Sequence, residues 1–239
     1  MKKIPAIALG NASADLLNEL CSQQEVQAKL LSNCGMKGAV MDYNVIGELK
    51  GKTNNIITVG GHLDSWDVGE GAHDDGAGCV QSVEVLRLLK QQNIPLKNTL
   101  RIVLFANEEN GAKGGAAYAD SALSKNEKHI FALESDAGGF SPRGFGLVMP
   151  EPQKEIVRSW RELLLPLGVY DFSREEGGVD ISPLGKKLKT PLSGLLPDTQ
   201  RYFDIHHNEN DIFENVNKRE LELGAVAMAA MVYLVDKYF

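Results

Sequence analysis

The chain has 239 residues, of which 43% are hydrophobic and 24% are charged, and its net charge at pH 7 is −7. This length and composition suit one large globular domain, or one domain with a fragment of another. The acidic balance argues against nucleic-acid binding, and no apolar run approaches the ~20 residues of a membrane span. The three cysteines, at positions 21, 34 and 79, follow no metal-site or disulfide pattern. A Cys21–Cys34 bridge stays open beside the preferred interpretation of buried or inert thiols.

The N-terminal segment, residues 1–14, has the basic end, apolar run and Ala-Ser-Ala sequence of a signal peptide. The apolar run is short and contains Pro5, so we prefer a strand at residues 4–9 that leads into a helix. Ser13 is a candidate cap for that helix, which we expect to reach about Leu20. Alternating apolar residues predict another strand near residues 26–30.

The remainder of the chain alternates between apolar runs and amphipathic segments. Strands are predicted at residues 40–49, 56–59, 99–106, 129–133, 145–149 and 191–196, and helices at 76–90, 114–123, 150–164 and 218–238. The first two of these strands are close enough along the chain to form a hairpin. The alternation of strands and helices from residue 56 predicts an α/β fold, with a mostly parallel mixed sheet flanked by helices on both faces.

Histidines and acidic residues follow the predicted strands or lie in the loops beyond them. These residues are His62, Asp64, Asp74, Glu108, Glu109, Asp136, His206 and His207. The carboxyl ends of parallel strands meet at one edge of a sheet, so we expect these side chains to converge there. Because burying several acids without a cation is costly, the sequence predicts a metal site at this edge.

Each part of this set also has a simpler interpretation. An acidic pair after a strand is usually a solvated turn, a His-His pair usually lies on a surface, and a histidine after two glycines can belong to a turn. The metal hypothesis rests on the whole combination at one edge. Two histidines and three carboxylates suit two zinc ions that share a bridging carboxylate. Of two adjacent glutamates, one can bind a metal while the other holds a water.

These motifs resemble the co-catalytic di-zinc aminopeptidase family, which includes secreted bacterial leucine aminopeptidases and glutamate carboxypeptidases. The matching segments are Gly61–Gly69, Asp74–Gly76, Glu108-Glu109, Glu134–Gly138, Asp180-Ile181 and Tyr202–His207. The resemblance covers about residues 40–239 and implies the zinc exopeptidase fold with two zinc ions. The ligands that it implies are His62 and Asp136 for one ion, Glu109 and His207 for the other, and Asp74 as the bridge.

The resemblance also implies roles for residues that do not bind metal. Glu108 would be the general base, and Asp64 would orient His62. Independently of the resemblance, the position of His206 just before His207 indicates that it would hydrogen-bond the developing oxyanion of the substrate. The Asp74–Asp75 peptide bond would be cis, as it is in relatives. Asp180 could help to form the substrate pocket, although a helix N-cap is the preferred role for it.

The domain organisation implied by the resemblance has two parts. Residues 1–37 resemble only the tail of a protease-associated insert, and residues 38–239 resemble the di-zinc peptidase domain. We therefore expect a catalytic core that lacks the front part of its relatives. Those relatives are secreted or periplasmic, but the chain carries no convincing signal peptide.

The function implied is that of a metal-dependent exopeptidase. Such an enzyme would hydrolyse the first peptide bond of unblocked dipeptides or short peptides with a zinc-bridged water. Two alternatives stay open: an amidohydrolase of the same clan, such as a deacylase, and a non-catalytic binding protein that retains the fold. A small peptide is the expected partner, nucleic acid and a membrane span are not expected, and a homodimer is a candidate oligomeric state.

Overall fold

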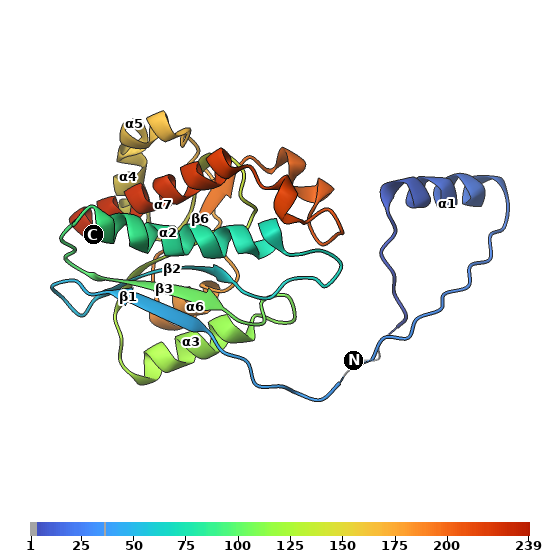
Figure 1. Cartoon of the computed structure of the whole chain (residues 1–239), viewed down its shortest axis with the longest axis horizontal. Coiled ribbons are helices and arrows are strands. Elements are labelled where there is room, and N and C mark those ends of the chain that lie inside the picture. Colours follow the sequence, from blue (N-terminus) through green and yellow to red (C-terminus); the bar gives the residue numbers. More distant parts are fainter. Residues whose placement is uncertain (1–3, 36) are drawn as a thin grey trace. The chain divides into compact units, whose positions relative to one another are not determined.

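The computed structural model describes residues 4–35 and 37–239 and divides the chain into two compact units, Met1–Met41 and Asp42–Phe239 (Figure 1). The first unit contains the helix α1 (Asn11–Gln23), which has no buried residue. Its N-cap is Gly10, and no side chain caps it, so the prediction that Ser13 caps the helix is wrong. Residues 1–3, the basic end of the segment that resembles a signal peptide, lie outside the described residues.

The two strands predicted in the first unit are not formed. Residues 4–9 and 26–30 have no regular secondary structure. A strand needs a neighbour that pairs with its backbone N–H and C=O groups, and these residues are mostly exposed. Apolar alternation alone is therefore a weak signal here. Cys21 and Cys34 are exposed free thiols, whereas Cys79 is buried. The assignment of residues 1–37 to the tail of an insert stays a prediction.

The second unit is built on one mixed sheet of six strands in the order β1-β3-β2-β4-β6-β5. The strands are β1 (Val45–Leu49), β2 (Ile56–His62), β3 (Thr99–Phe105), β4 (His129–Glu134), β5 (Pro142–Val148) and β6 (Leu192–Pro197). The four central strands are parallel, while β1 and β5 are antiparallel to their neighbours. The mostly parallel mixed sheet predicted from the sequence is confirmed.

The predicted hairpin between the first two strands of this unit is wrong. β1 pairs with β3 in antiparallel register, with Val45 opposite Leu104, and β2 lies between β3 and β4. Burial explains the order of the strands. All seven residues of β2 are buried, so this strand needs neighbours on both sides, whereas β1 is mostly exposed and suits an edge.

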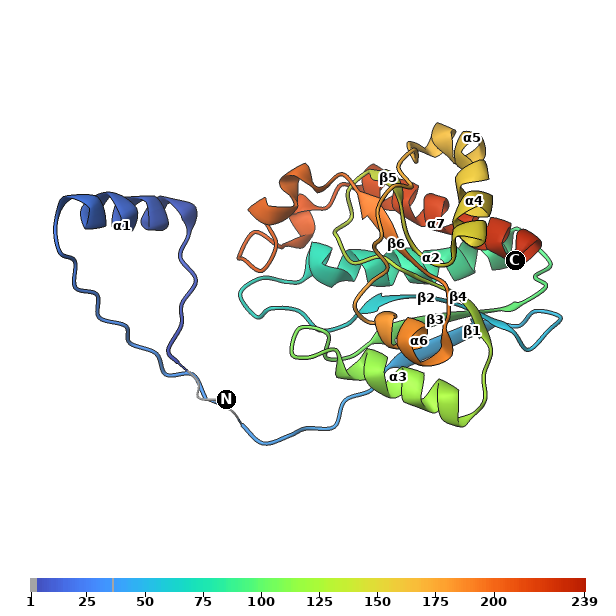
Figure 2. The ribbon, with the colours of Figure 1, turned by 180° about the vertical axis from the view of Figure 1, so that it is seen from behind.

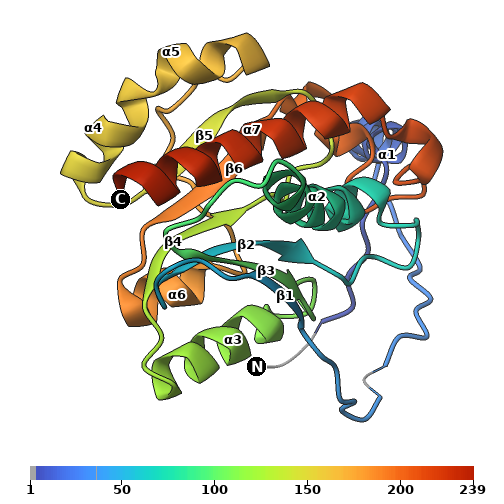
Figure 3. The same cartoon turned by 60° about the vertical axis from the view of Figure 1, so that its left-hand side comes forward.

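Helices cover both faces of the sheet. α2 (Ala77–Gln91) and α7 (Lys218–Tyr238) pack together on one face, and α3 (Lys113–Ser124) and α6 (Ser182–Leu188) on the other (Figures 2 and 3). The remaining helical segments are α4 (Glu151–Ser159), α5 (Arg161–Leu164) and the short turns η1 (Ala72–Gly76), η2 (Leu165–Leu167), η3 (Thr199–Asp204) and η4 (Phe213–Asn215). Among the described residues, no helix combines the length and apolarity required to cross a bilayer.

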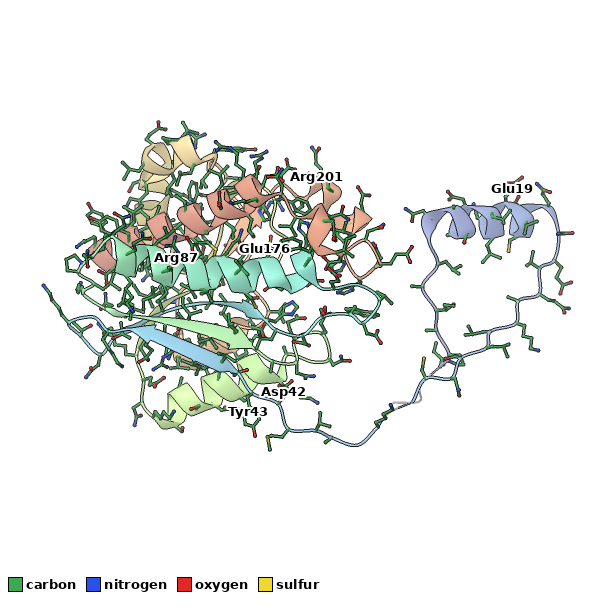
Figure 4. All side chains as sticks on the ribbon, in the orientation of Figure 1. Glu19, Asp42, Tyr43, Arg87, Glu176 and Arg201 are labelled. Atoms are coloured by element: carbon green, nitrogen blue, oxygen red, sulfur yellow. The ribbon has the colours of Figure 1, made fainter. Side chains whose placement is uncertain are left out.

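The spacing of Val80, Val83, Leu86 and Leu89 predicts one apolar face for α2, but the buried face of this helix differs from it. Val80 and Val83 are 56% and 50% exposed, while Gln81 is buried and donates a hydrogen bond to the backbone O of Leu221 in α7. A Cβ at Gly224 of α7 would lie 2.2 Å from Gln81 Nε2, so small residues set how closely the two helices approach. The opposite face of α2 carries exposed charges such as Arg87 (Figure 4).

Candidate metal centre

The structure brings the predicted site residues together at the carboxyl edge of the sheet. His62 ends β2, and Asp136 follows β4 by two residues. Glu108 and Glu109 follow β3, Asp74 lies in η1, and the His206-His207 pair follows η3. The convergence at one edge follows from the parallel order of β3, β2 and β4.

The first cluster is centred on the buried imidazole of His62. Its Nε2 lies 3.2 Å from Asp74 Oδ1 and 3.2 Å from Asp136 Oδ1. Burial by itself lowers the pKa of His62, but the hydrogen bonds to Asp136 and Asp74 raise that pKa well above its usual value. A cation at this position would satisfy both carboxylates, whereas a single N–H can point well at only one of them.

The second cluster surrounds the other carboxylate oxygen of Asp74, Oδ2. His207 Nε2 is 3.1 Å from Asp74 Oδ2 and 3.1 Å from Glu109 Oε2. His206 stacks on His207 with ring centroids 3.6 Å apart, and its Nε2 lies 3.4 Å from Asp74 Oδ2. Trp66 also stacks on His207, and its indole N–H donates a hydrogen bond of 2.6 Å to Glu109 Oε2.

These residues fit a pair of cations. Asp74 Oδ2 and Glu109 Oε1 are buried without a hydrogen-bond partner in the part of the chain that the structure describes, although Asp74 Oδ2 lies within ion-pair distance of both histidines. Ligand atoms around a tetrahedral zinc, with bonds of about 2.0–2.2 Å, lie about 3.3–3.6 Å apart. The separations of 3.1–3.2 Å in the two clusters are close to that spacing. The nitrogen and oxygen donors also suit zinc.

Asp64 contacts both His62 and the turn that carries the two glutamates. Its carboxylate accepts hydrogen bonds from the backbone N–H of Glu108 at 2.9 Å and of Glu109 at 3.1 Å. Its backbone O, rather than its carboxylate, accepts from His62 Nδ1 at 2.7 Å, because the nearest carboxylate oxygen is 3.8 Å from that nitrogen. Asp64 therefore fixes the turn that presents the two glutamates and, through its main chain, orients His62.

Two further acids support the site without facing a metal, and sequence reasoning assigned no role to either. The Asp74–Asp75 peptide bond is cis, as the resemblance implied. Asp75 is buried and accepts hydrogen bonds of 2.9 Å from the backbone N–H of His62 and of Gly78. Asp211 accepts from the backbone N–H of His73 and of Asp74. Neither role has a local signal in the sequence, because each joins segments that are separated along the chain.

Asp180 is not a helix N-cap, because α6 begins after Ile181 and no side chain caps it. Its side chain is fully buried, and neither carboxylate oxygen has a hydrogen-bond partner among residues 4–35 and 37–239. Burial raises the pKa of Asp180 to about 7; nearby His62 opposes this shift, and the charge of Glu108 adds to it. The first helical residue of α6 is Ser182, two positions after Asp180, so the N-cap position belongs to Ile181.

The predicted general base, Glu108, is half-buried beside the two clusters. Burial raises the pKa of Glu108 above its usual value, and the charge of Asp136 adds to the effect. A cavity of about 190 Å³ adjoins Asp136 on the side of β6. It is walled by Glu134, Asp136, Ala137, Glu176, Gly177, Gly178, Val179, Gly194 and Leu195. The site thus combines candidate ligands, a candidate base and space for a small group.

The fold and the site define an α/β protein with a candidate two-metal centre at the carboxyl edge of a mostly parallel sheet. The family model of Peptidase family M28 matches residues 44–232. The chain belongs to this family, which confirms the resemblance found in the sequence.

The relatives of the chain extend this comparison. Human carboxypeptidase Q is 30% identical over 98% of the chain and 50% of its own length. The crystal structure of a Peptidase M28 precursor from Shewanella amazonensis SB2B is 31% identical, with a TM-score of 0.83 over 95% of this chain and 52% of that one. A zinc aminopeptidase from Bacillus subtilis, 24% identical, shares the fold with a TM-score of 0.64 over 82% of this chain and 51% of its own. The chain spans about half the length of the curated relatives it matches.

Proposed function

We propose that this protein is a metal-dependent exopeptidase that hydrolyses the first peptide bond of unblocked dipeptides or short peptides. The observation that carries the proposal is the position of Asp74, whose two carboxylate oxygens face two different histidines, His62 and His207. Membership of a peptidase family supports this function. The names of the relatives, a carboxypeptidase and a zinc aminopeptidase, support an exopeptidase and zinc as the metal.

The proposed cofactors are two zinc ions. His62 and Asp136 would hold one ion, Glu109 and His207 would hold the other, and Asp74 would be shared. When bound, such a pair polarises the substrate carbonyl and makes water a stronger nucleophile at neutral pH. The buried oxygens of Asp74 and Glu109 that lack a partner support this arrangement, since unpaired buried carboxylates are costly.

Glu108 is the proposed general base. It would take a proton from the attacking water and pass it to the leaving amine. Its raised pKa brings it closer to the operating pH, where a general base is most effective. Asp64 accepts a hydrogen bond from the backbone N–H of Glu108, which helps to hold the turn that carries the proposed base.

His206 is proposed to donate a hydrogen bond to the developing oxyanion. Burial lowers the pKa of His206, and the neighbouring His207 lowers it further, so its imidazole is neutral and keeps one N–H at neutral pH. The acids around the clusters would favour the ammonium group of an unblocked substrate. An N-acyl group would bring neither that charge nor a ligand atom.

A paired comparison tests the proposal. Zinc content is measured on the purified chain, and a free dipeptide and its N-acetyl form are then assayed at equal concentration with zinc supplied. We expect the acetylated form to be cleaved at least about a hundredfold more slowly, a loss of roughly 2.7 kcal/mol of transition-state stabilisation. Equal or faster cleavage of the acetylated form would indicate a deacylase instead. Bound metal without turnover of either compound would indicate a binding protein.

A further inference from the structure

A cavity of about 640 Å³ has no predicted metal ligand in its wall. It is formed where α4 and α6 flank the start of β6 (Figure 3). Ligand sites for small molecules commonly have volumes of ~300–1,000 Å³, so this cavity has the size of a binding site.

The charges around this cavity favour an anion. Three lysines and one glutamate line it: Lys154, Lys186, Lys189 and Glu175. Glu175 is already paired with the ammonium group of Lys154. Within residues 4–35 and 37–239, Lys186 and Lys189 form no ion pair, and the only hydrogen bond of Lys189 Nζ is a long one of 3.4 Å to the backbone O of Lys186. Two positive charges therefore stand free at one cavity in a chain whose net charge is −7.

A buried polar group points to the same conclusion. Thr190 is only 4% exposed and lines the cavity, and its hydroxyl has no hydrogen-bond partner among the described residues. Buried hydroxyl groups are nearly always paired, because leaving one unpaired costs about 1–3 kcal/mol. The hydroxyl oxygen itself has almost no accessible surface, so a ligand oxygen acceptor becomes its partner once the Thr190 side chain rotates toward the cavity.

The rest of the wall is apolar. Met149, Pro150, Pro191 and Leu192 line the cavity together with Val148. An inorganic ion would leave this surface in contact with water, whereas a ligand with a hydrocarbon part would cover it. The combination of free ammonium groups, an unpartnered hydroxyl and apolar walls fits an organic anion.

The cavity shares part of its wall with the smaller cavity beside Asp136. Gly177 and Gly178 line both. A Cβ at Gly178 would lie 2.4 Å from Cδ of Glu134, and a Cβ at Gly177 would lie 3.1 Å from Cβ of Leu192. A side chain therefore does not fit at Gly178 and would be tight at Gly177, and a ligand in the larger cavity would contact the loop that walls the metal side.

We propose that this cavity is a binding site for a small organic carboxylate with an apolar body. Its carboxylate would lie near Lys186, Lys189 and the Thr190 hydroxyl, and its hydrocarbon part would lie against Met149 and Leu192. Such a site is separate from the proposed peptidase reaction. Binding can therefore be measured directly, whether or not the chain cleaves peptides.

Isothermal titration of the full chain with octanoate tests the proposal. We expect one octanoate per chain, with octanamide and inorganic phosphate each binding at least about tenfold more weakly, since one lacks the charge and the other lacks the apolar part. Lys186→Glu should weaken octanoate binding by about tenfold or more. Thr190→Val, which removes the hydroxyl at almost constant volume, should weaken it several-fold and provides a second variant should Lys186→Glu fail to fold.

Lys187→Glu is the matched control. Lys187 lies on the same helix, pairs with Asp120 and does not line the cavity, yet its substitution changes the net charge by the same amount. We expect this variant to bind octanoate within about twofold of the unaltered chain, as for a distant surface charge. Equal weakening by Lys186→Glu and Lys187→Glu, equal binding of phosphate and octanoate, or no saturable octanoate binding would each overturn the proposal.

Discussion

The carboxylate of Asp211 holds the backbone of Asp74, the residue whose side chain stands between the two histidine clusters. Asp211 Oδ2 accepts a hydrogen bond from the N–H of Asp74 at 3.1 Å, and Oδ1 accepts one from the N–H of His73 at 2.6 Å. Asp211 is only 4% exposed. The position of the proposed bridging ligand therefore depends on a residue that lies 137 positions further along the chain.

This relationship predicts that Asp211→Ala weakens metal binding while the fold is retained. Loss of a group that orients a metal ligand typically costs about 10–100-fold in metal affinity. Competition with a chromophoric zinc chelator measures the change. Glu209→Ala is the control, because Glu209 is exposed and two positions away. Equal affinities of the two variants would show that Asp211 does not position Asp74.

Substitution of the adjacent glutamates should separate catalysis from metal binding. Glu108→Gln is expected to keep the full zinc content and to lose about 10²–10⁴-fold in kcat, as for removal of a general base. Glu109→Gln should instead lose zinc, because Glu109 Oε2 faces His207 Nε2. Elemental analysis and dipeptide assays on both variants give the answer. Normal turnover by Glu108→Gln at unchanged zinc content would assign the base elsewhere.

The two adjacent histidines should also differ. Nε2 of each lies near Asp74 Oδ2, at 3.4 Å for His206 and 3.1 Å for His207, but only His207 also faces Glu109. We expect His207→Ala to lower the zinc content by about one ion per chain, and His206→Ala to keep both ions while kcat falls by about 10²–10³-fold. Zinc loss from His206→Ala alone would exchange the two roles.

The strand ends and the family motifs were readable from the sequence, since each proposed metal ligand follows an apolar run or belongs to a short motif. The hydrogen bonds that hold the backbone near those residues were not readable from the sequence. The carboxylate of Asp64 bonds to residues 108 and 109, and that of Asp211 to residues 73 and 74, so neither partnership has a local pattern. The prediction that the first two strands of the second unit form a hairpin was wrong for the same reason. The choice of β3 rather than β2 as the neighbour of β1 depends on tertiary burial, which periodicity does not encode.

The role predicted for Asp180 was also wrong, because a local sequence pattern does not describe tertiary burial. Its place before Ser182 and Pro183 is typical of a helix N-cap, yet its side chain lies in the interior and makes no capping hydrogen bond. A sequence pattern describes the chain near a residue, whereas burial of a carboxylate depends on which distant segments pack around it. The titration of this group gives the next prediction.

Asp180→Asn should stabilise the metal-free chain, and more so at high pH. Burial raises the pKa of Asp180 from 3.8 to about 7, so the folded state favours the protonated form. The contribution of Asp180 to the stability of the unaltered chain is therefore highest below the unfolded pKa, falls as the pH rises from about 4 to 7, and is constant above that range. Asparagine carries no charge at any of these pH values, so the variant avoids this loss.

Chemical denaturation in urea with a chelator present, at pH 5 and at pH 8, measures the effect. The stability difference in favour of Asp180→Asn should grow by roughly 2–3 kcal/mol between the two pH values, since each unit of pKa shift corresponds to about 1.4 kcal/mol. Asp204→Asn, at an exposed position, is the control and should show no such growth. If both variants kept the same offset from the unaltered chain at pH 5 and pH 8, the carboxylate of Asp180 would be ionised in the fold at both values, and a partner for its charge would have to exist.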